Sequence, residues 1–104
     1  PAHAALRAAT LGGAQALGLE ARVGSIVPGK EADLVAVRFS GPELEPCYDP
    51  VSHLVYVAGR QQISHVWVAG HALVQGGELL NPAFSGLDTR CKLWQNTLAA
   101  IPGL

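Results

Sequence analysis

The sequence contains no methionine, only two cysteines and few charged residues, which make up 14% of its 104 positions. Cys47 and Cys91 are too few for a disulfide scaffold, so we interpret both as reduced thiols of a cytoplasmic protein. A net charge of −1 offers no electrostatic attraction for nucleic acid or for an anionic membrane. No apolar run approaches the roughly 20 residues that a membrane-spanning helix needs. Neither nucleic acid nor a membrane is therefore expected as a partner.

Apolar residues make up 49% of the chain, which is typical of a globular protein and excludes a disordered one. The length suffices for one domain with a modest core. The opening Pro1-Ala2-His3 and the lack of any methionine lead us to expect a fragment that is truncated on its N-terminal side.

The first third of the sequence favours helix. High intrinsic propensity predicts a helix over residues 2–11, with Pro1 at its first position, where a missing N–H costs nothing. Gly12-Gly13 is expected to interrupt this helix. A second short helix would then cover Ala14–Leu17 and end at Gly18 as its C-terminal cap.

The middle of the sequence predicts a turn, a strand and a short helix. Val27-Pro28-Gly29-Lys30 has the composition of a type II turn. Residues 33–39 are apolar on both faces except at Arg38, which predicts a strand covered on both sides. Residues 40–48 are expected to form a loop. Asp49-Pro50 predicts the N-cap and first residue of a helix. The apolar stripe of that helix is Val51, Leu54, Val55 and Ala58.

Alternation over residues 61–74 predicts a β-hairpin that turns at Ala69-Gly70 and ends at Gly76-Gly77. A final helix follows. Ser85-Gly86-Leu87-Asp88 fits a capping box if the helix begins there, and Pro102-Gly103 ends it. Its apolar residues recur at spacings of three and four, forming one stripe: Phe84, Leu87, Cys91, Trp94, Leu98 and Ile101.

A phosphate-binding loop is one alternative for Gly24-x-x-x-x-Gly29-Lys30. Glu31, however, stands where such a loop needs a hydroxyl for Mg²⁺. The order is also reversed, because a phosphate-binding loop follows a strand and precedes a helix. The turn interpretation is therefore preferred.

The histidines His3, His53, His65 and His71 invite a metal hypothesis, but none pair at the spacings that place two imidazoles on one ion. His65 and His71 could approach each other across the hairpin, although no carboxylate or thiol nearby completes a ligand set. Cys47 lies in a proline-rich loop with no local base to activate it as a nucleophile. We interpret these side chains as structural or solvated.

Three stretches together resemble the amidohydrolase superfamily. They are AALRAATLGGAQALGL (4–19), VGSIVPGKEADLVAV (23–37) and VSHLVYVAGRQQISHVWVAGHALV (51–74). The third stretch favours the chlorohydrolase and aminohydrolase branch, which includes 5-methylthioadenosine/S-adenosylhomocysteine deaminases. The resemblance covers most of the chain and is weakest over 78–104.

This resemblance implies a (β/α)8 (TIM) barrel joined to a small β-sandwich, a composite domain built from both chain ends. A divalent metal, zinc or iron, would activate water for hydrolytic deamination of a small-molecule substrate, an aminated purine nucleoside or related heterocycle. No residue of this chain matches a family metal ligand, and Asp33 and Asp49 are not candidates because they lie at a strand start and a helix cap. We expect no catalytic, cofactor-binding or metal residue in this fragment.

The expected fold is therefore an α+β fragment in three parts. Residues 1–19 would be the last barrel helix region, 20–80 a portion of the composite domain with an inserted short helix, and 81–104 the C-terminal helix. Its partner would be the missing N-terminal part of the same chain, without which we expect it to be inactive and poorly soluble or self-associating. The alternative is a stand-alone α+β binding or dimerisation module. A homo-oligomer is compatible with both the fragment and the module hypothesis.

Overall fold

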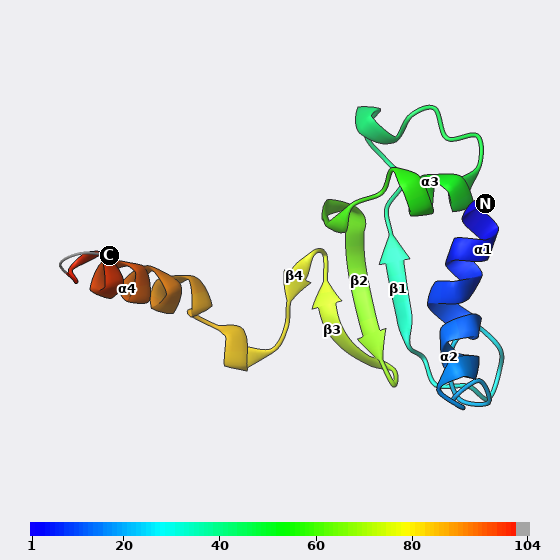
Figure 1. Cartoon of the computed structure of the whole chain (residues 1–104), viewed down its shortest axis with the longest axis horizontal. Helices are drawn as coiled ribbons and strands as arrows, with labels where there is room; N and C mark the ends of the chain where they lie inside the picture. Colours follow the sequence, from blue (N-terminus) through cyan, green and yellow to red (C-terminus); the bar gives the residue numbers. More distant parts are fainter. Residues whose placement is uncertain (102–104) are drawn as a thin grey trace.

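A computed structural model describes residues 1–101. Its centre is an antiparallel sheet with the strand order β1-β2-β3-β4 (Figure 1). The strands are β1 (Leu34–Val37), β2 (Ile63–Val68), β3 (His71–Gln75) and β4 (Glu78–Leu79). The helices are α1 (Ala2–Arg7), α2 (Gly13–Ala16), α3 (Pro50–Tyr56) and α4 (Leu87–Ala99). The α+β class expected from the sequence is confirmed at this level.

The predicted break at Gly12-Gly13 is wrong, because the helix continues through it. A π-helical turn, Ala8–Gly12, joins α1 to α2, and both glycines keep an ordinary helical φ of −63°. The wider turn brings the Arg7 carbonyl oxygen within 3.0 Å of where a Cβ on Gly12 would lie. Glycine therefore serves here to let the turn widen and not to end the helix.

The predicted cap at Gly18 and the predicted type II turn are both confirmed. Gly18 has φ +68°, its N–H donates to the Gln15 carbonyl, and the Leu19 N–H donates to the Ala14 carbonyl. These two bonds form the Schellman motif that ends many helices. At the turn, Gly29 has φ +94° and the Lys30 N–H donates to the Val27 carbonyl.

Strand β1 is shorter than the predicted 33–39 and is not covered on both sides in this chain, since Val35 is 58% exposed. The loop over 40–48 is present and contains a short 3-10 turn, Pro42–Leu44. Helix α3 begins as predicted, with Asp49 as N-cap and Pro50 as first residue. It packs against α1, so residues far apart in sequence meet at one end of the molecule (Figure 1).

The predicted hairpin is confirmed, and a further strand follows it. Ala69 and Gly70 both have positive φ and join β2 to β3 in a two-residue turn. Positive φ recurs at Gly76-Gly77, where the return strand β3 ends as predicted. This second turn adds the short strand β4, with Gln75 paired to Glu78.

The final helix begins at Leu87, later than the predicted capping box requires. Its N-cap is Gly86 with φ +72°, and no side chain caps it, so the box at Ser85 is not formed. Asp88 still lies in the first turn, where the helix dipole favours a negative charge. The predicted end at Pro102-Gly103 lies outside the described residues.

The molecule divides into a body, residues 1–80, and an arm, residues 81–101. Figure 1 shows α4 extending away from the sheet, on the side opposite α1 and α2. The radius of gyration is 18.6 Å, whereas about 13 Å is usual for this length. The accessible area is 7971 Å², against about 5,500 Å² for a compact protein of this mass. The chain therefore leaves much of its apolar surface uncovered.

Buried apolar side chains among the described residues are few: Ala2, Ala14 and Leu44. They do not form one central core, because they lie on α1, on α2 and in the 40–48 loop. None of the helices within residues 1–101 is both long and apolar enough to cross a membrane.

Candidate functional site

The Lys30 side chain closes the segment that links α2 to β1. Its ammonium group donates to the Ser25 hydroxyl at 2.8 Å and to the Val23 carbonyl at 3.4 Å, and also contacts the Glu20 carbonyl. A phosphate-binding lysine has to present its charge to a ligand, whereas this one is surrounded by the protein's own oxygens. A helix precedes the segment and a strand follows it, as the sequence indicated. The segment is therefore a structural turn.

An ion pair reinforces the same segment from outside. Arg22 Nη2 lies 2.5 Å from Glu31 Oε1, and the Glu31 N–H donates to the Arg22 carbonyl. The hydrogen bond and charge of Glu31 raise the pKa of Arg22, which stays charged at any physiological pH. Backbone and side chain thus hold the two ends of the segment together.

Asp33 and Asp49 lie where the sequence placed them, at a strand start and at a helix cap. Asp33 Oδ1 accepts from the Ala69 N–H at 2.7 Å, which ties the start of β1 to the β2–β3 turn. Asp49 accepts from the N–H groups of Val51 and Ser52, both at 3.2 Å, and from the Ser52 hydroxyl at 2.5 Å. The Ser52 hydroxyl is the main reason that the pKa of Asp49 is lowered, and the charge of His3 adds to the effect. Both carboxylates are engaged in holding the fold.

The histidines are dispersed, and two of them contact aromatic rings. His65 stacks on Trp67 with ring centroids 5.3 Å apart, and its Nδ1 lies 3.1 Å from the Ser64 hydroxyl. His53 meets Phe39 edge to face at 6.5 Å. His65 does not approach His71 across the hairpin. It pairs with Gln75, four positions and about 13 Å along β3 from His71.

The described part of the chain brings no metal ligand set together. Within residues 1–101 no group of three or more His, Cys, Asp or Glu side chains lies close enough to hold an ion. Cys47 is half-buried in its loop, and Cys91 is exposed on α4. The residues present therefore do not fit a catalytic metal.

What the body does present is an apolar groove of about 680 Å³ between the α1–α2 helix and β1. Residues from both sides line it, including Leu6, Leu17, Ile26, Val35 and Leu54. Leu17 is 75% and Ile26 88% exposed, which is unusual for large apolar side chains in a finished core. The groove adjoins β1, the strand at the edge of the sheet. Such a surface suits docking of another apolar element and not catalysis.

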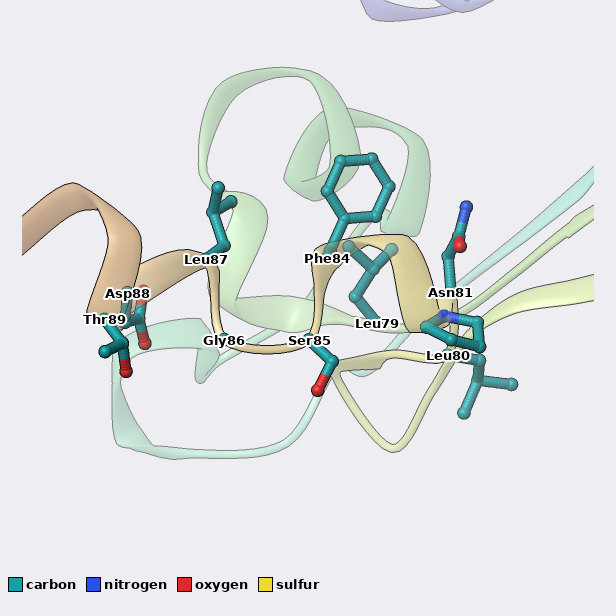
Figure 2. A pocket seen from close by; sticks show the side chains of 10 residues that line it. Leu79, Leu80, Asn81, Phe84, Ser85, Gly86, Leu87, Asp88 and Thr89 are labelled. Carbon is teal, nitrogen blue, oxygen red and sulfur yellow. The ribbon is translucent and has the colours of Figure 1, made fainter.

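A second hollow, of about 560 Å³, lies where the body joins the arm. Residues 79–82 and 84–89 line it, and Phe84 and Leu87 point to one side of the ribbon while Ser85 points to the other (Figure 2). The side chains that Figure 2 labels include one carboxylate, Asp88, at the start of α4. This hollow continues the apolar surface of the arm.

The sequence predicts uncovered apolar faces in general terms, as a helix face and sheet edges of a fragment and as a dimer face over 84–101 in the alternative module, but it does not locate the groove beside α1 and β1. One signal for the first was present, because β1 reads as apolar on both faces and in this chain only one part of it is covered. The signal for the second was the stripe over 84–101. The described residues leave both surfaces exposed. A pattern of apolar residues along the sequence does not show which of them the fold covers.

A model of the amidohydrolase family matches residues 1–73. Among curated relatives, the chain is 39% identical over 99 residues to a 5-methylthioadenosine/S-adenosylhomocysteine deaminase of Teredinibacter turnerae, covering 95% of this chain and 22% of the relative. It is 45% identical over 80 residues to the enzyme of that name from Halobacterium salinarum, covering 77% of this chain and 18% of the relative. The chain thus spans about a fifth of the length of the curated relatives it matches.

Solved structures give the same picture. A zinc-bound adenosine deaminase from Xanthomonas campestris matches 97% of this chain with 23% of its own, at a TM-score of 0.83 and 42% identity. A zinc complex of atrazine chlorohydrolase from Arthrobacter aurescens matches 88% with 20% of its own, at a TM-score of 0.76 and 26% identity. The resemblance stated from the three sequence stretches is confirmed.

Proposed function

The chain belongs to the amidohydrolase family, and on that premise we propose that it is the C-terminal structural part of a metal-dependent hydrolase acting on non-peptide C–N bonds. The reaction would be hydrolytic deamination of an aminated purine nucleoside or related heterocycle, in which water replaces the amino group and ammonia leaves. The observation that carries the proposal is the match of nearly the whole chain to less than a quarter of a zinc-bound deaminase, at 42% identity.

In this proposal the chain consists of three parts. Residues 1–19 would be the last barrel helix region, 20–80 a portion of the composite β domain with a short inserted helix, and the segment from residue 81 onward the part that contains the C-terminal helix α4. The apolar groove beside α1 and β1 supports this division, because it needs a further apolar element to cover it.

The metal, zinc or iron, and its ligands would come from the remainder of the polypeptide. The described residues offer no ligand set, so no catalytic step is assigned to them. Their role is to complete the fold: Lys30 and the Arg22–Glu31 pair hold the segment between helix and sheet, and Asp49 caps α3.

The coding DNA upstream of the Pro1 codon provides the test. An open frame carrying an H-x-H motif is expected, and the extended protein should release ammonia from 5′-methylthioadenosine, S-adenosylhomocysteine or adenosine. A chelator should abolish this activity, whereas the 104-residue chain alone should have none. A start codon within a few residues of Pro1, or chelator-sensitive turnover by the 104-residue chain alone, would overturn the proposal.

A second candidate is a stand-alone α+β binding or dimerisation module. The exposed stripe on α4 favours it, because an isolated module needs a partner for that face. It predicts an initiator codon close to Pro1 and a soluble, folded dimer of the 104-residue chain.

A further inference from the structure

The arm carries an apolar stripe that no other part of the described chain covers. Large side chains along it are between 43% and 67% exposed: Phe84, Leu87, Trp94, Leu98 and Ile101. Cys91 lies between them and is exposed too. Leu87, Cys91, Trp94 and Leu98 follow one another at spacings of three and four residues, which places them on one face of α4. Phe84 lies in the 3-10 turn before the helix and Ile101 lies just after its end. This face is the surface to be explained.

Helix α4 has little to stabilise it within this chain. It has 13 residues, no side-chain N-cap bond and no sizeable contact with another element in residues 1–101. Isolated helices of about 12–15 residues are marginal in water, and most helices in proteins depend on packing of an apolar face. A helix of this kind therefore needs a cover to persist.

We infer that the stripe seats the arm on the preceding part of the same polypeptide. This inference rests on the proposed function. The solved deaminase supports it, because the match extends over 97% of this chain while more than three quarters of that chain lie outside the match. The arm thus has a counterpart in a chain that contains a large additional body against which it can pack.

The area of the stripe favours this occupant over a second copy of the chain. With about half of each side chain exposed and about 200 Å² for a large apolar side chain, the five side chains expose about 500 Å². A stable contact between separate proteins buries about 800 Å² on each partner. A contact within one polypeptide forms without the loss of translational freedom that association of two molecules entails, so a smaller area suffices.

Cys91 provides a reporter inside the stripe. In the extended protein encoded by the whole gene, modification of Cys91 by a maleimide, followed by peptide mass spectrometry, should be slow and independent of protein concentration. The urea-unfolded protein gives the rate for an uncovered thiol. Modification as fast as in urea would show that nothing covers the stripe. Protection that disappears on dilution, together with dissociation of a dimer, would show that the cover is a second copy. Either result overturns the inference.

A matched pair of variants tests the same point through stability. Leu98 lies on the stripe and Leu93 on the opposite side of α4, and both are exposed in this chain. In the extended protein Leu98→Ala should lower the Tm by several degrees and speed modification of Cys91, whereas Leu93→Ala should change neither. Equal effects of the two substitutions would contradict the inference.

The outcomes separate this inference from the proposed function. Ammonia release together with an unprotected Cys91 would contradict the inferred seating of the arm but would not contradict the proposed hydrolase function. Protection of Cys91 in a monomer that does not deaminate any of the three nucleosides would sink the proposed function and leave the seating intact.

Discussion

The body and the arm contain similar local sequence patterns for turns and helices, but they differ in how far these elements contact the rest of the chain. In the body each turn or cap has a partner elsewhere: Asp33 bonds to the hairpin turn at Ala69, and α3, capped by Asp49, packs on α1. In the arm, α4 begins at a left-handed glycine and carries a regular apolar stripe, yet it makes no sizeable contact with another element in residues 1–101. Local sequence can therefore define a helix without supplying the contacts that keep it folded. The inferred seating of the arm would supply the contacts that residues 1–101 lack.

The largest effect within the body should come from Lys30→Met. The substitution removes charge-assisted hydrogen bonds to two carbonyl oxygens and the Ser25 hydroxyl. One such bond contributes about 1.5–3 kcal/mol net of the bonds to water that it replaces, and because Lys30 is only half-buried we take that value for the three together. We expect a loss of about 1.5–3 kcal/mol in the free energy of unfolding, measured by urea denaturation of the extended protein. Glu20→Gln, which keeps the backbone carbonyl, is the matched control and should have little effect. No loss for Lys30→Met would mean that the segment does not depend on this side chain.

A pair of glycine substitutions sharpens the contrast between the regions. Gly70 in the β2–β3 turn and Gly86 before α4 have φ of +79° and +72°, and a Cβ at either would meet no atom within 4 Å. The backbone strain of alanine should thus be similar at both, about 1–2 kcal/mol. In the 104-residue chain Gly70→Ala should reduce protection of the hairpin amides, while Gly86→Ala should leave them unchanged. Loss of hairpin protection in Gly86→Ala, seen by hydrogen exchange, would show that the arm is coupled to the body.

The Asp49 cap should contribute a smaller, pH-dependent effect. The Ser52 hydroxyl and two N–H groups lower the pKa of Asp49, so its contribution is fully present above the ordinary carboxyl pKa of about 4 and is lost as pH falls through the lowered value. Asp49→Ala should lower the Tm at pH 7, whereas Asp49→Asn, which can still cap, should change it less. The difference between wild type and Asp49→Asn should shrink below about pH 4. A constant difference across a pH series of melting curves would contradict this account.

The sequence correctly predicted turns and caps that depend only on the residues forming them. Gly18, Pro28-Gly29 and Asp49-Pro50 each fix the backbone through their own conformational preferences, and all three were predicted correctly. The features that it missed depend on other residues. The helix passes through Gly12-Gly13 by widening its turn, and β4 forms because a second two-residue turn brings Glu78 against Gln75.

The candidate site was less accessible to sequence reasoning than the fold. The family resemblance rested on three stretches and is confirmed, because such motifs keep their residues and spacing. In the sequence, the apolar groove and the stripe of the arm appear only as patterns of apolar residues. Whether an apolar side chain is buried depends on its neighbours in space, and Ile26 and Trp94 remain largely exposed among the described residues.

Hydrogen exchange of α4, compared between the 104-residue chain and the extended protein, tests the central claim most directly. The account predicts that α4 amides exchange nearly as fast as in an unfolded chain when the 104 residues are alone, and roughly tenfold or more slower in the extended protein. The β2–β3 hairpin serves as the internal reference and should be protected in both. Equal exchange of α4 in the two proteins would contradict the claim that the arm is completed by the rest of the polypeptide.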